Sequence, residues 1–297
     1  MTSLPTIALL GTGLLGRAVA ERLHAVGHTV IAFNRTATKA LPLQSHGIAV
    51  VSTADLAVSQ ADCALLLLSD AQAVRSVLFT PHCSAALNGK TIVQMGTIRS
   101  NESLEIQQEV ERRGGAYCEA PVLGSLAEAK AGTLFVMMGG TPEQFDAWSF
   151  VFRSLSREPR YIGPVGRASA LKLALNQLIA AETSAFASSL GLVQRSGVAV
   201  ETFMAILRDS ALYAPTFDKK LPRLLKRDYR QPNFSTRHLL KDVRLFLQEA
   251  AARGVATEGL EGLPLLLDRA IAKGFGDADY SALFEAVNPP DVGGPPS

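Results

Sequence analysis

Short apolar runs alternate with amphipathic stretches through the first half of the chain. Thr6–Leu10 is apolar and partly β-branched, as expected of a strand buried on both faces, and a helical pattern follows from Leu14 to Val26. The alternation continues to about residue 155. We predict further strands at Thr29–Phe33, Ile48–Val51, Cys63–Leu68, Thr91–Met95, Ala116–Glu119 and Leu134–Met138, and helices at Ala54–Gln60, Ala71–Leu78, Ser100–Arg113 and Pro142–Leu155. Such alternation predicts a parallel sheet with helices on both faces.

After Pro164 the strand pattern stops. One long helix is predicted from Gly166 to Gly197, because this stretch lacks proline and Gly191 is the only glycine between its ends. Its apolar residues spread around most of the circumference, so we expect the helix to be buried on nearly every side. Further helices are predicted at Glu201–Arg208, Pro215–Leu225, Ser235–Arg253, Leu260–Lys273 and Tyr280–Ala286.

The composition is that of an ordinary globular protein, with 47% hydrophobic and 19% charged residues among 297. A net charge of +2 gives no support for nucleic acid or a membrane surface as a partner. No signal-peptide pattern precedes the first apolar run, so we expect a cytoplasmic protein. Cys63, Cys83 and Cys118 are odd in number and lack paired spacing, so neither a disulfide framework nor a metal site is expected.

A glycine-rich motif follows the first predicted strand directly. Gly11, Thr12, Gly13, Leu14, Leu15 and Gly16 have the G-x-G-x-x-G spacing and open the first predicted helix. Strand, motif and helix in this order are typical of a dinucleotide-binding loop, in which the backbone approaches the pyrophosphate and the helix N-terminus offers it free amides. The fold class is therefore α/β: a Rossmann-type domain over residues 1–165, an all-helical domain over residues 166–287, and a Pro- and Gly-rich tail over residues 288–297 that we expect to be disordered.

The end of the second predicted strand bears on the choice of cofactor. Enzymes that use NAD place a carboxylate there for the ribose hydroxyl, but this chain has Asn34, Arg35 and Thr36. The guanidinium of Arg35 suits a phosphate. We predict NADPH (NADP⁺) as the cofactor; the alternative is that Arg35 is an ordinary solvent-facing residue.

Lys172 lies inside the long apolar helix, where a lysine needs a partner or a function. Asn176 follows four residues later on the same helical face. Lysines near a helix start commonly extend to solvent, and that remains the alternative interpretation. Polar or special residues also follow three strands, at Ser69–Asp70, Gly96–Thr97 and Pro121–Ser125. Ligands bind at such strand ends in open α/β sheets.

Four stretches together resemble the β-hydroxyacid dehydrogenase family, which includes 3-hydroxyisobutyrate dehydrogenase and the glyoxylate and succinic semialdehyde reductases. They are LLGTGLLGRAVAERL, EAPVLGS from Glu119, GRASALKLALNQL around Lys172, and NFSTRHLLKDVRL around Asp242. The resemblance covers about residues 5 to 287. It implies a catalytic lysine at Lys172 with Asn176 as its partner, substrate and nicotinamide contacts at Thr97, Leu123, Gly124 and Ser125, and a site closed from the helical domain by Phe234, Lys241 and Asp242. We therefore expect cofactor contacts at the glycine-rich loop, Asn34–Thr36, Leu68, Ser69, Thr97 and Lys241. We expect substrate contacts at Thr97, Leu123, Gly124, Ser125, Lys172, Asn176, Phe234 and Asp242. The resemblance also implies a homodimer or homotetramer formed through the helical domain.

The chain departs from the family at Leu123, because the family's P-V-S-G turn has a serine there that holds a substrate carboxylate. We therefore expect a larger or more apolar carbonyl compound as substrate. Gly96 also stands where the family commonly has serine. The expected reaction is reduction of an aldehyde or ketone, with Lys172 as general acid, because a lysine with an ordinary pKa of about 10.4 carries a proton at neutral pH. An imine reductase and a non-catalytic NADPH-binding protein are the alternatives.

Overall fold

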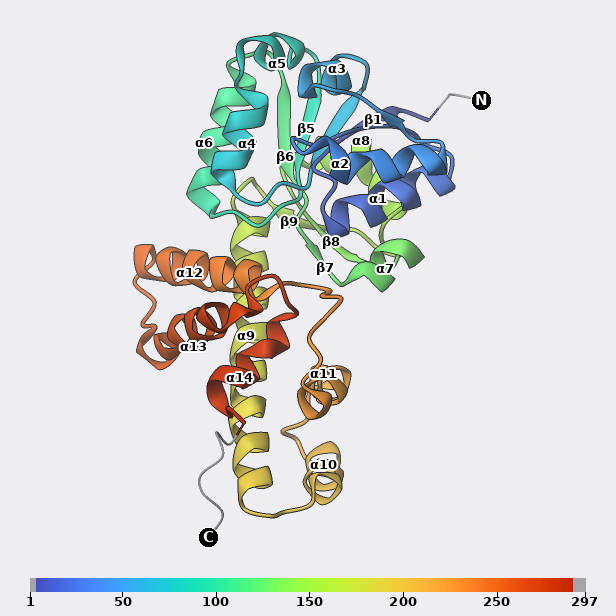
Figure 1. Ribbon diagram of the computed structural model, residues 1–297. Helices are drawn as coiled ribbons and strands as arrows, with labels where there is room; N and C mark the ends of the chain where they lie inside the picture. Colours follow the sequence, from blue (N-terminus) through green and yellow to red (C-terminus); the bar gives the residue numbers. More distant parts are fainter. Residues whose placement is uncertain (1–3, 291–297) are drawn as a thin grey trace. The chain divides into compact units, whose positions relative to one another are not determined.

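The computed structural model describes residues 4–290 and divides into two compact units, Met1–Leu173 and Ala174–Ser297. The first unit holds the sheet and the second is helical, as the sequence predicted (Figure 1). The division falls inside the long helix, after Leu173, whereas the predicted domain boundary lies before Gly166.

In the first unit, the strands described form one sheet in the order β3-β2-β1-β4-β5-β6-β8-β7, with β9 beside β8. The pairs from β3 to β6 are all parallel. The bounds are β1 Thr6–Leu10, β2 Thr29–Phe33, β3 Ala49–Val50, β4 Cys63–Leu66, β5 Thr91–Gln94, β6 Ala116–Glu119, β7 Val122–Leu123, β8 Phe135–Gly139 and β9 Arg160–Gly163. The predicted strands are all present, while β7 and β9 were missed because each contains only two apolar residues, too few to form a strand pattern.

One part of the sheet differs from the fully parallel arrangement that was predicted. β8 runs antiparallel to both β6 and β7. The chain between β6 and β8 contains only the turn with β7 and one six-residue helix, α7 Leu126–Ala131. A parallel connection needs a crossover of a dozen or more residues, usually with a longer helix, so this short segment returns antiparallel.

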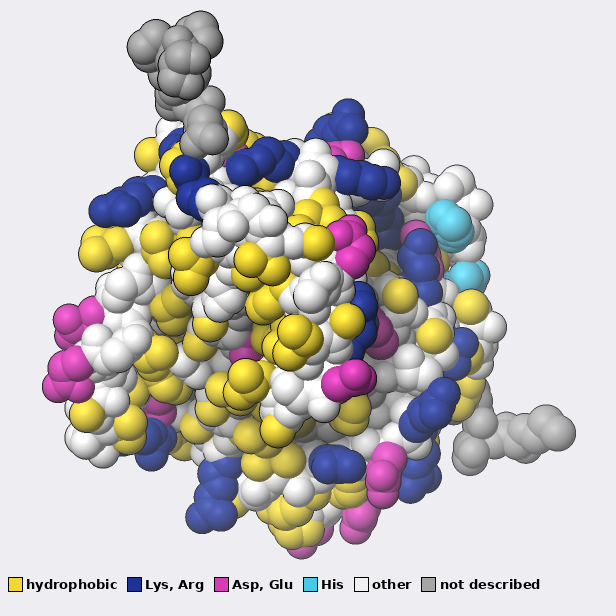
Figure 2. All heavy atoms as spheres, turned by 90° about the horizontal axis from the view of Figure 1, so that it is seen from below, with side chains coloured by type: hydrophobic (Ala, Val, Ile, Leu, Met, Phe, Trp, Pro, Cys, Tyr) yellow, Lys and Arg dark blue, Asp and Glu magenta, His cyan; other side chains and the backbone are white. Residues whose placement is uncertain are grey.

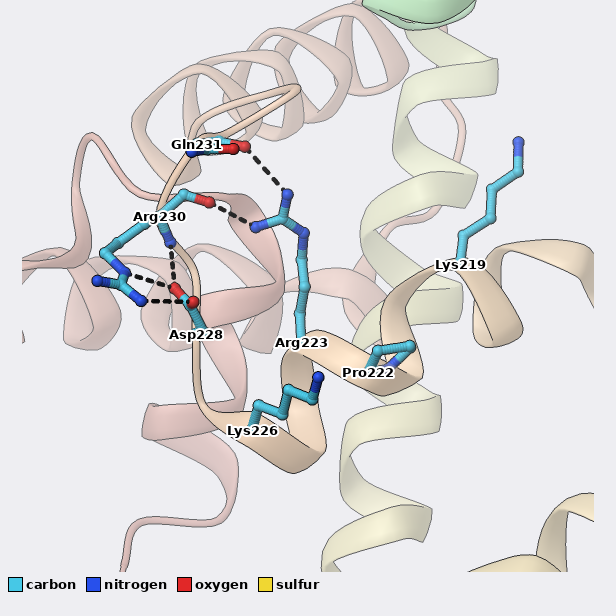
Figure 3. A pocket seen from close by; sticks show the side chains of 7 residues that line it. All are labelled: Lys219, Pro222, Arg223, Lys226, Asp228, Arg230 and Gln231. Atoms are coloured by element: carbon cyan, nitrogen blue, oxygen red, sulfur yellow. Dashed lines mark hydrogen bonds and ion pairs between the residues drawn. The ribbon is translucent and has the colours of Figure 1, made fainter.

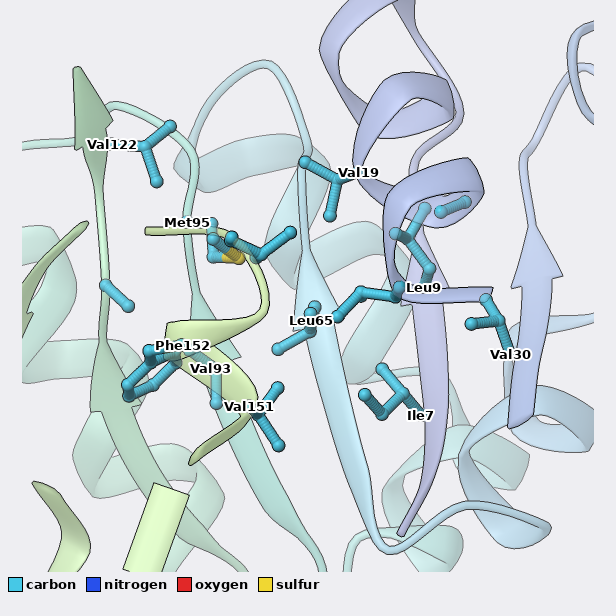
Figure 4. Close-up of a cluster of buried hydrophobic side chains, with 14 of the residues drawn as sticks. Ile7, Leu9, Val19, Val30, Leu65, Val93, Met95, Val122, Val151 and Phe152 are labelled. Carbon is cyan, nitrogen blue, oxygen red and sulfur yellow. The ribbon is translucent and has the colours of Figure 1, made fainter. Parts of the chain in front are cut away.

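Helices cover both faces of the sheet, as predicted. Alternate residues of β1 point to opposite faces: Ile7 and Leu9 belong to one apolar cluster, and Ala8 and Leu10 to another. The first cluster includes residues of α1 and α8 (Figure 4), and the second includes residues of α3 to α6. The helices are α1 Leu14–Ala25, α2 Ala37–Ala40, the 3₁₀ helix η1 Leu41–His46, α3 Ala54–Ser59, α4 Ala71–Leu78, α5 Pro81–Ala86, α6 Ser100–Glu111 and α8 Pro142–Arg153.

The second unit packs around a third apolar cluster that includes Phe186, Phe217, Leu239 and Phe284. Phe186 and Phe217 are stacked with ring centroids 4.6 Å apart. The elements are α10 Val200–Asp209, α11 Pro215–Lys226, α12 Thr236–Ala252, η2 Glu258–Leu260, α13 Gly262–Ala270, the π-helical turn η3 Ile271–Phe275, η4 Tyr280–Leu283 and α14 Phe284–Val287. All five helices predicted for this unit therefore exist, the last two in broken form.

The long helix α9 spans Arg167–Arg195, close to the predicted bounds. The expectation that it is buried on nearly every side is wrong for the single chain. Ala174, Leu178, Ala185 and Leu192 are exposed, with Leu178 at 50% and Leu192 at 69%. They are separated by four, seven and seven residues, close to whole helical turns, so they share one face. The helix α9 therefore leaves an apolar stripe uncovered.

Asn288 also differs from prediction, because it was expected to belong to the disordered tail. It is buried, and its side chain accepts a hydrogen bond from Arg195 Nε at 2.7 Å and donates one to Gln194 at 3.1 Å. The last part of that predicted tail, residues 291–297, lies outside the described residues.

Candidate functional site

The glycine-rich loop after β1 is shaped by close backbone contacts. The amide of Gly11 donates to the carbonyl of Phe33 at 2.9 Å, and Gly11 has a positive φ of 105°. A Cβ on Gly11 would lie 2.4 Å from the carbonyl oxygen of Leu67, and a Cβ on Gly16 would lie 2.0 Å from that of Gly11. Only glycine fits at these two positions. At Gly13, by contrast, a Cβ would meet nothing within 4 Å.

Two features of this loop fit a dinucleotide. The space beside Gly13 is open, and Gly13 precedes the first turn of α1, where backbone amides lack partners within the helix. The hydroxyl of Thr12 is buried and has no hydrogen-bond partner in the described part of the chain. Leaving such a hydroxyl without a partner costs free energy. The loop therefore suits a ligand that brings hydrogen-bonding groups, such as a pyrophosphate.

Asn34 ties the loop to the end of β2. Its Oδ1 accepts from the amide of Thr12 at 3.0 Å, and its Nδ2 donates to the carbonyl of Thr36 at 3.0 Å. Arg35 and Thr36 are both exposed. Of the remaining motif residues, Leu14 is 46% exposed and Leu15 is half-buried. Asn34 therefore holds the loop, while Arg35 and Thr36 remain accessible to a ligand.

The predicted contacts after β4 and β5 lie beside this loop, because β1, β4 and β5 are neighbours in the sheet. Leu68 and Thr97 are half-buried and Ser69 is exposed. The Ser69 hydroxyl donates to Asp70 at 2.9 Å, and Asp70 in turn caps α4 by accepting from the amide of Ala73. A Cβ on Gly96 would lie 2.4 Å from the Leu68 carbonyl oxygen, so the serine common in the family would not fit this backbone unchanged.

The turn after β6 carries three of the predicted substrate contacts. Leu123 is half-buried, and Gly124 has a φ of 138° that favours glycine. Ser125 is the N-cap of α7, and both its amide and its hydroxyl donate to Glu128. Ser125 is thus already engaged in holding α7, whereas the Leu123 side chain offers only apolar surface.

Lys172 is buried, with 9% of its surface exposed, so it does not extend freely to solvent. It lies in the second turn of α9. Asn176, one turn further along, is 3% exposed and donates from Nδ2 to Asp242 at 2.6 Å. Lys241 forms an ion pair with Asp242 at 2.9 Å. We call Asn176, Lys241 and Asp242 the α12 cluster.

Phe234, at the start of α12, is half-buried between two rings. It stacks on His238 with centroids 6.3 Å apart and meets Tyr280 edge-on at 6.0 Å. Burial first, and then the charge of Lys241, lowers the pKa of His238 below its usual value. Phe234 is therefore linked to the α12 cluster through His238, which it stacks on and whose pKa the charges of Lys241 and Asp242 affect.

Two features of the structure were not predicted from the sequence. The first is Glu119, which was quoted in a motif but given no role, because its partners lie about 16 and 50 residues away. The second is a basic pocket in the helical unit, lined by Lys219, Pro222, Arg223, Lys226, Asp228, Arg230 and Gln231 (Figure 3). Arg223 donates to the carbonyls of Arg230 and Gln231, and Arg230 pairs with Asp228. None of the predicted site residues lines this pocket.

Among residues 4–290, no three His, Cys, Asp or Glu side chains are grouped so that they could hold a metal ion. No helix in this range is long and apolar enough to cross a membrane.

Comparison with known proteins decides the family. Residues 6–163 match the NAD-binding domain of 6-phosphogluconate dehydrogenase, and residues 166–287 match the NAD-binding domain of NADP-dependent 3-hydroxyisobutyrate dehydrogenase. The chain belongs to the β-hydroxyacid dehydrogenase family. It is thus an NAD(P)-dependent oxidoreductase of the 3-hydroxyisobutyrate dehydrogenase-like type, as the sequence predicted.

Two curated relatives of this β-hydroxyacid dehydrogenase are similar over nearly its whole length. Glyoxylate/succinic semialdehyde reductase 1 of Arabidopsis thaliana is 30% identical over 95% of this chain and 98% of the relative. The cytokine-like nuclear factor N-PAC of Homo sapiens is 28% identical over 94% of this chain. The chain spans about half of N-PAC, 51% of its length.

Solved structures of the family share the fold. The 3-hydroxyisobutyrate dehydrogenase of Mycobacterium tuberculosis, solved with L-serine, has a TM-score of 0.85 and 25% identity over 96% of this chain and 99% of its own. An imine reductase from Myxococcus stipitatus, solved with NADP⁺, has a TM-score of 0.67 and 20% identity over 95% of this chain and 100% of its own. The second likeness concerns the fold alone.

Proposed function

We propose that this dehydrogenase reduces an aldehyde or ketone to the alcohol with NADPH, and that Lys172 is the general acid. The observation that carries this proposal is the burial of Lys172, because a lysine is almost never buried in an apolar helix without a function or a partner. The glycine-rich loop, in the same compact unit, fits a dinucleotide.

Bound NADPH supplies a hydride to the carbonyl carbon. As the carbon–oxygen π bond breaks, its electron pair passes to the oxygen, which takes a proton from Nζ of Lys172. The neutral amine then regains a proton from water. Asn176 donates a hydrogen bond to Asp242, so the orientation of its amide is fixed. It lies on the same helical face as Lys172.

Replacing Lys172 tests the proposal. Lys172→Ala should lower kcat by about two to four orders of magnitude, because general acid catalysis contributes that much. NADPH oxidation with a carbonyl substrate is the measurement. Lys130, an exposed lysine of α7, offers a matched control, and Lys130→Ala should keep full turnover. A Lys172→Ala enzyme with most of its turnover would rule out the acid role.

We further propose a preference for NADPH over NADH. Arg35 and Thr36 are exposed after β2, and no carboxylate stands there to receive a ribose hydroxyl. Arg35→Ala should raise the KM for NADPH while leaving that for NADH unchanged. Lys39→Ala, at an exposed cation of the neighbouring α2, serves as the control. A higher kcat/KM with NADH in the natural enzyme would contradict the preference.

For the substrate, we propose a carbonyl compound more apolar than glyoxylate or succinic semialdehyde. Leu123 cannot donate a hydrogen bond to a carboxylate, and losing one such bond costs about 1 to 3 kcal/mol. In a panel of carbonyl compounds, apolar members should therefore give the higher kcat/KM. Leu123→Ser should shift the order toward carbonyl acids, and Leu123→Val is the control. Glyoxylate outperforming every apolar compound would refute this.

Imine reduction is a second candidate, favoured by the apolar Leu123. Lys172 argues against it, because imine reductases generally have an aspartate or tyrosine at the matching position. Assaying a cyclic imine beside an aldehyde separates the two activities.

A non-catalytic role is the third candidate, since the relative N-PAC is named a nuclear factor. The burial of both Lys172 and Asn176 favours an enzyme. Hydride transfer to any carbonyl compound would dismiss the non-catalytic role.

We also propose that the protein forms a homodimer or homotetramer through the helical unit. Leu178 and Leu192 of the apolar stripe on α9 are exposed, and so are Ile206 of α10 and Leu212, at 69% and 77%. Figure 2, seen from below the view of Figure 1, also shows hydrophobic side chains gathered over part of the surface. Leu178→Asp with Leu192→Asp should yield a monomer in sedimentation, whereas Leu4→Asp, at an exposed leucine of the first unit, should not. A monomeric natural protein would contradict the proposal.

A cytoplasmic location is also proposed. Cys63, Cys83 and Cys118 are all free and buried, which is usual in a reducing compartment. Imaging the tagged full chain in its own cells tests the location.

A further inference from the structure

Glu119 is a buried carboxylate to which the reaction proposed above assigns no part. It is the last residue of β6 and is 0% exposed. The turn that carries Leu123 follows it directly. Charged side chains are almost never fully buried unless they are paired, so the partners of Glu119 indicate what it does.

The carboxylate holds the first turn of α9. Its Oε1 accepts from the backbone amides of Gly166, Ala168 and Ser169 at 2.8, 2.9 and 3.1 Å. Its Oε2 accepts from the hydroxyl of Ser169 at 2.6 Å. Free amides and a partial positive charge lie at a helix N-terminus, so a carboxylate is the favoured group there. Glu119 therefore caps α9 from another element of the same unit.

Other contacts prevent the carboxylate from moving. The hydroxyl of Ser103, on α6, donates to Oε2 at 2.6 Å, and Ser103 is itself hydrogen-bonded to the hydroxyl of Tyr117 at 2.8 Å. Both residues are 0% exposed. Gly139 of β8 pairs with Glu119, and a Cβ on it would lie 2.6 Å from Oε1. The carboxylate fills the space left by this glycine.

Lys172 follows Ser169 by three residues, which is one helical turn. The position of its backbone is therefore set by the turn that Glu119 holds. We propose that Glu119 is a positioning residue for proton donation: it fixes the start of α9 to β6 and thereby places the amine of Lys172. This inference rests on the proposed acid role of Lys172.

Glu119→Gln is the first test. The glutamine keeps an oxygen for the three amides, but its NH₂ group cannot accept from the hydroxyls of Ser103 and Ser169. We expect kcat to fall by about tenfold to a hundredfold, as small misplacements of reacting groups do, while the KM for NADPH stays within about twofold. Wild-type kcat in a folded Glu119→Gln enzyme would overturn the inference.

A double-mutant cycle shows whether Glu119 acts through Lys172. In a Lys172→Ala background, Glu119→Gln should change the residual kcat by less than about twofold, because no amine is left to position. The same loss in both backgrounds would overturn the inference and leave the acid role intact. Full turnover in Lys172→Ala alone would instead reject the acid role, and this inference with it.

Two further variants guard against a general loss of structure. Thr141→Ala removes the side-chain cap of α8 in the same unit and should lower the melting temperature but not kcat. Ser169→Ala removes one of the five hydrogen bonds and should lower kcat less than Glu119→Gln, again only when Lys172 is present. If Glu119→Gln fails to fold, Ser169→Ala serves as the test of the inference in its place. An equal loss of kcat in Thr141→Ala would overturn the inference.

Discussion

The glycine-rich loop of the first unit and the α12 cluster of the second are built by different means. In the loop, carbonyl oxygens lie so close to Gly11 and Gly16 that no side chain fits. In the α12 cluster, an amide, an ammonium and a carboxylate meet through their side chains. A site made from backbone should tolerate no added atom, whereas a site made from side chains should depend on each partner being present.

Gly16→Ala should have the largest effect. The new Cβ would lie 2.0 Å from the Gly11 carbonyl oxygen, so backbone must shift to admit it. We expect the free energy of unfolding to fall by about 3 kcal/mol or more, the upper end of what overpacking costs. Urea denaturation without cofactor is the measurement. Gly262→Ala, where a Cβ would meet nothing within 4 Å, is the matched control.

Asp242→Ala tests the α12 cluster in the same way. Asn176 is buried and would lose its acceptor, so we expect a loss of about 1 to 3 kcal/mol in unfolding free energy. Asp242→Asn leaves an acceptor for Asn176 and removes only the charge beside Lys241, so its loss should be smaller. Equal losses in the two variants would show that the ion pair, and not the amide contact, holds the cluster.

Gly13→Ala tests a position of the loop where added atoms meet no protein atom. Its Cβ would meet nothing within 4 Å, so the stability of the free protein should not change. A methyl group would, however, stand where the cofactor backbone is expected to approach, and the Kd for NADPH should rise by about tenfold, or 1.4 kcal/mol. Fluorescence titration measures this. Unchanged affinity would place the pyrophosphate elsewhere.

The smallest expected effect is a loss of stability at acidic pH. Burial lowers the pKa of His28, whose ring nitrogen Nε2 lies 3.0 Å from the Ser154 hydroxyl. Because the unfolded chain binds a proton at His28 more readily than the folded chain, stability should decline as the pH falls below about 6.5, the ordinary histidine pKa. Denaturation midpoints from pH 7.5 to 5 should therefore fall, less so in His28→Gln. Parallel curves for both proteins would contradict this.

The glycine-rich loop could be predicted from the sequence more fully than the α12 cluster. The loop depends on residues adjacent in the chain, so a local motif and its flanking strand and helix were enough to place it. The contact between Asn176 and Asp242 joins residues 66 apart, and only the family resemblance indicated it. Glu119 and its partners are 16 to 50 residues apart, and since no local pattern marks a helix cap supplied by a strand, its role was missed.

Two errors have a related origin. The apolar residues of α9 predicted burial on nearly every side, but periodicity does not say whether a second chain or the same chain covers a given face. Strand alternation predicted parallel pairing throughout, yet the direction of β8 depends on the short segment before it, which has room only for the six residues of α7.

The pairing of Glu119 with Gly139 has a consequence for making chimaeras with related enzymes. A relative with a side chain at the position of Gly139 must carry a smaller group at that of Glu119, so exchanging either strand alone would bring two bulky groups into one space. β6 and β8 should be exchanged as a single cassette, and crossover points in a shuffled library belong outside residues 116 to 139.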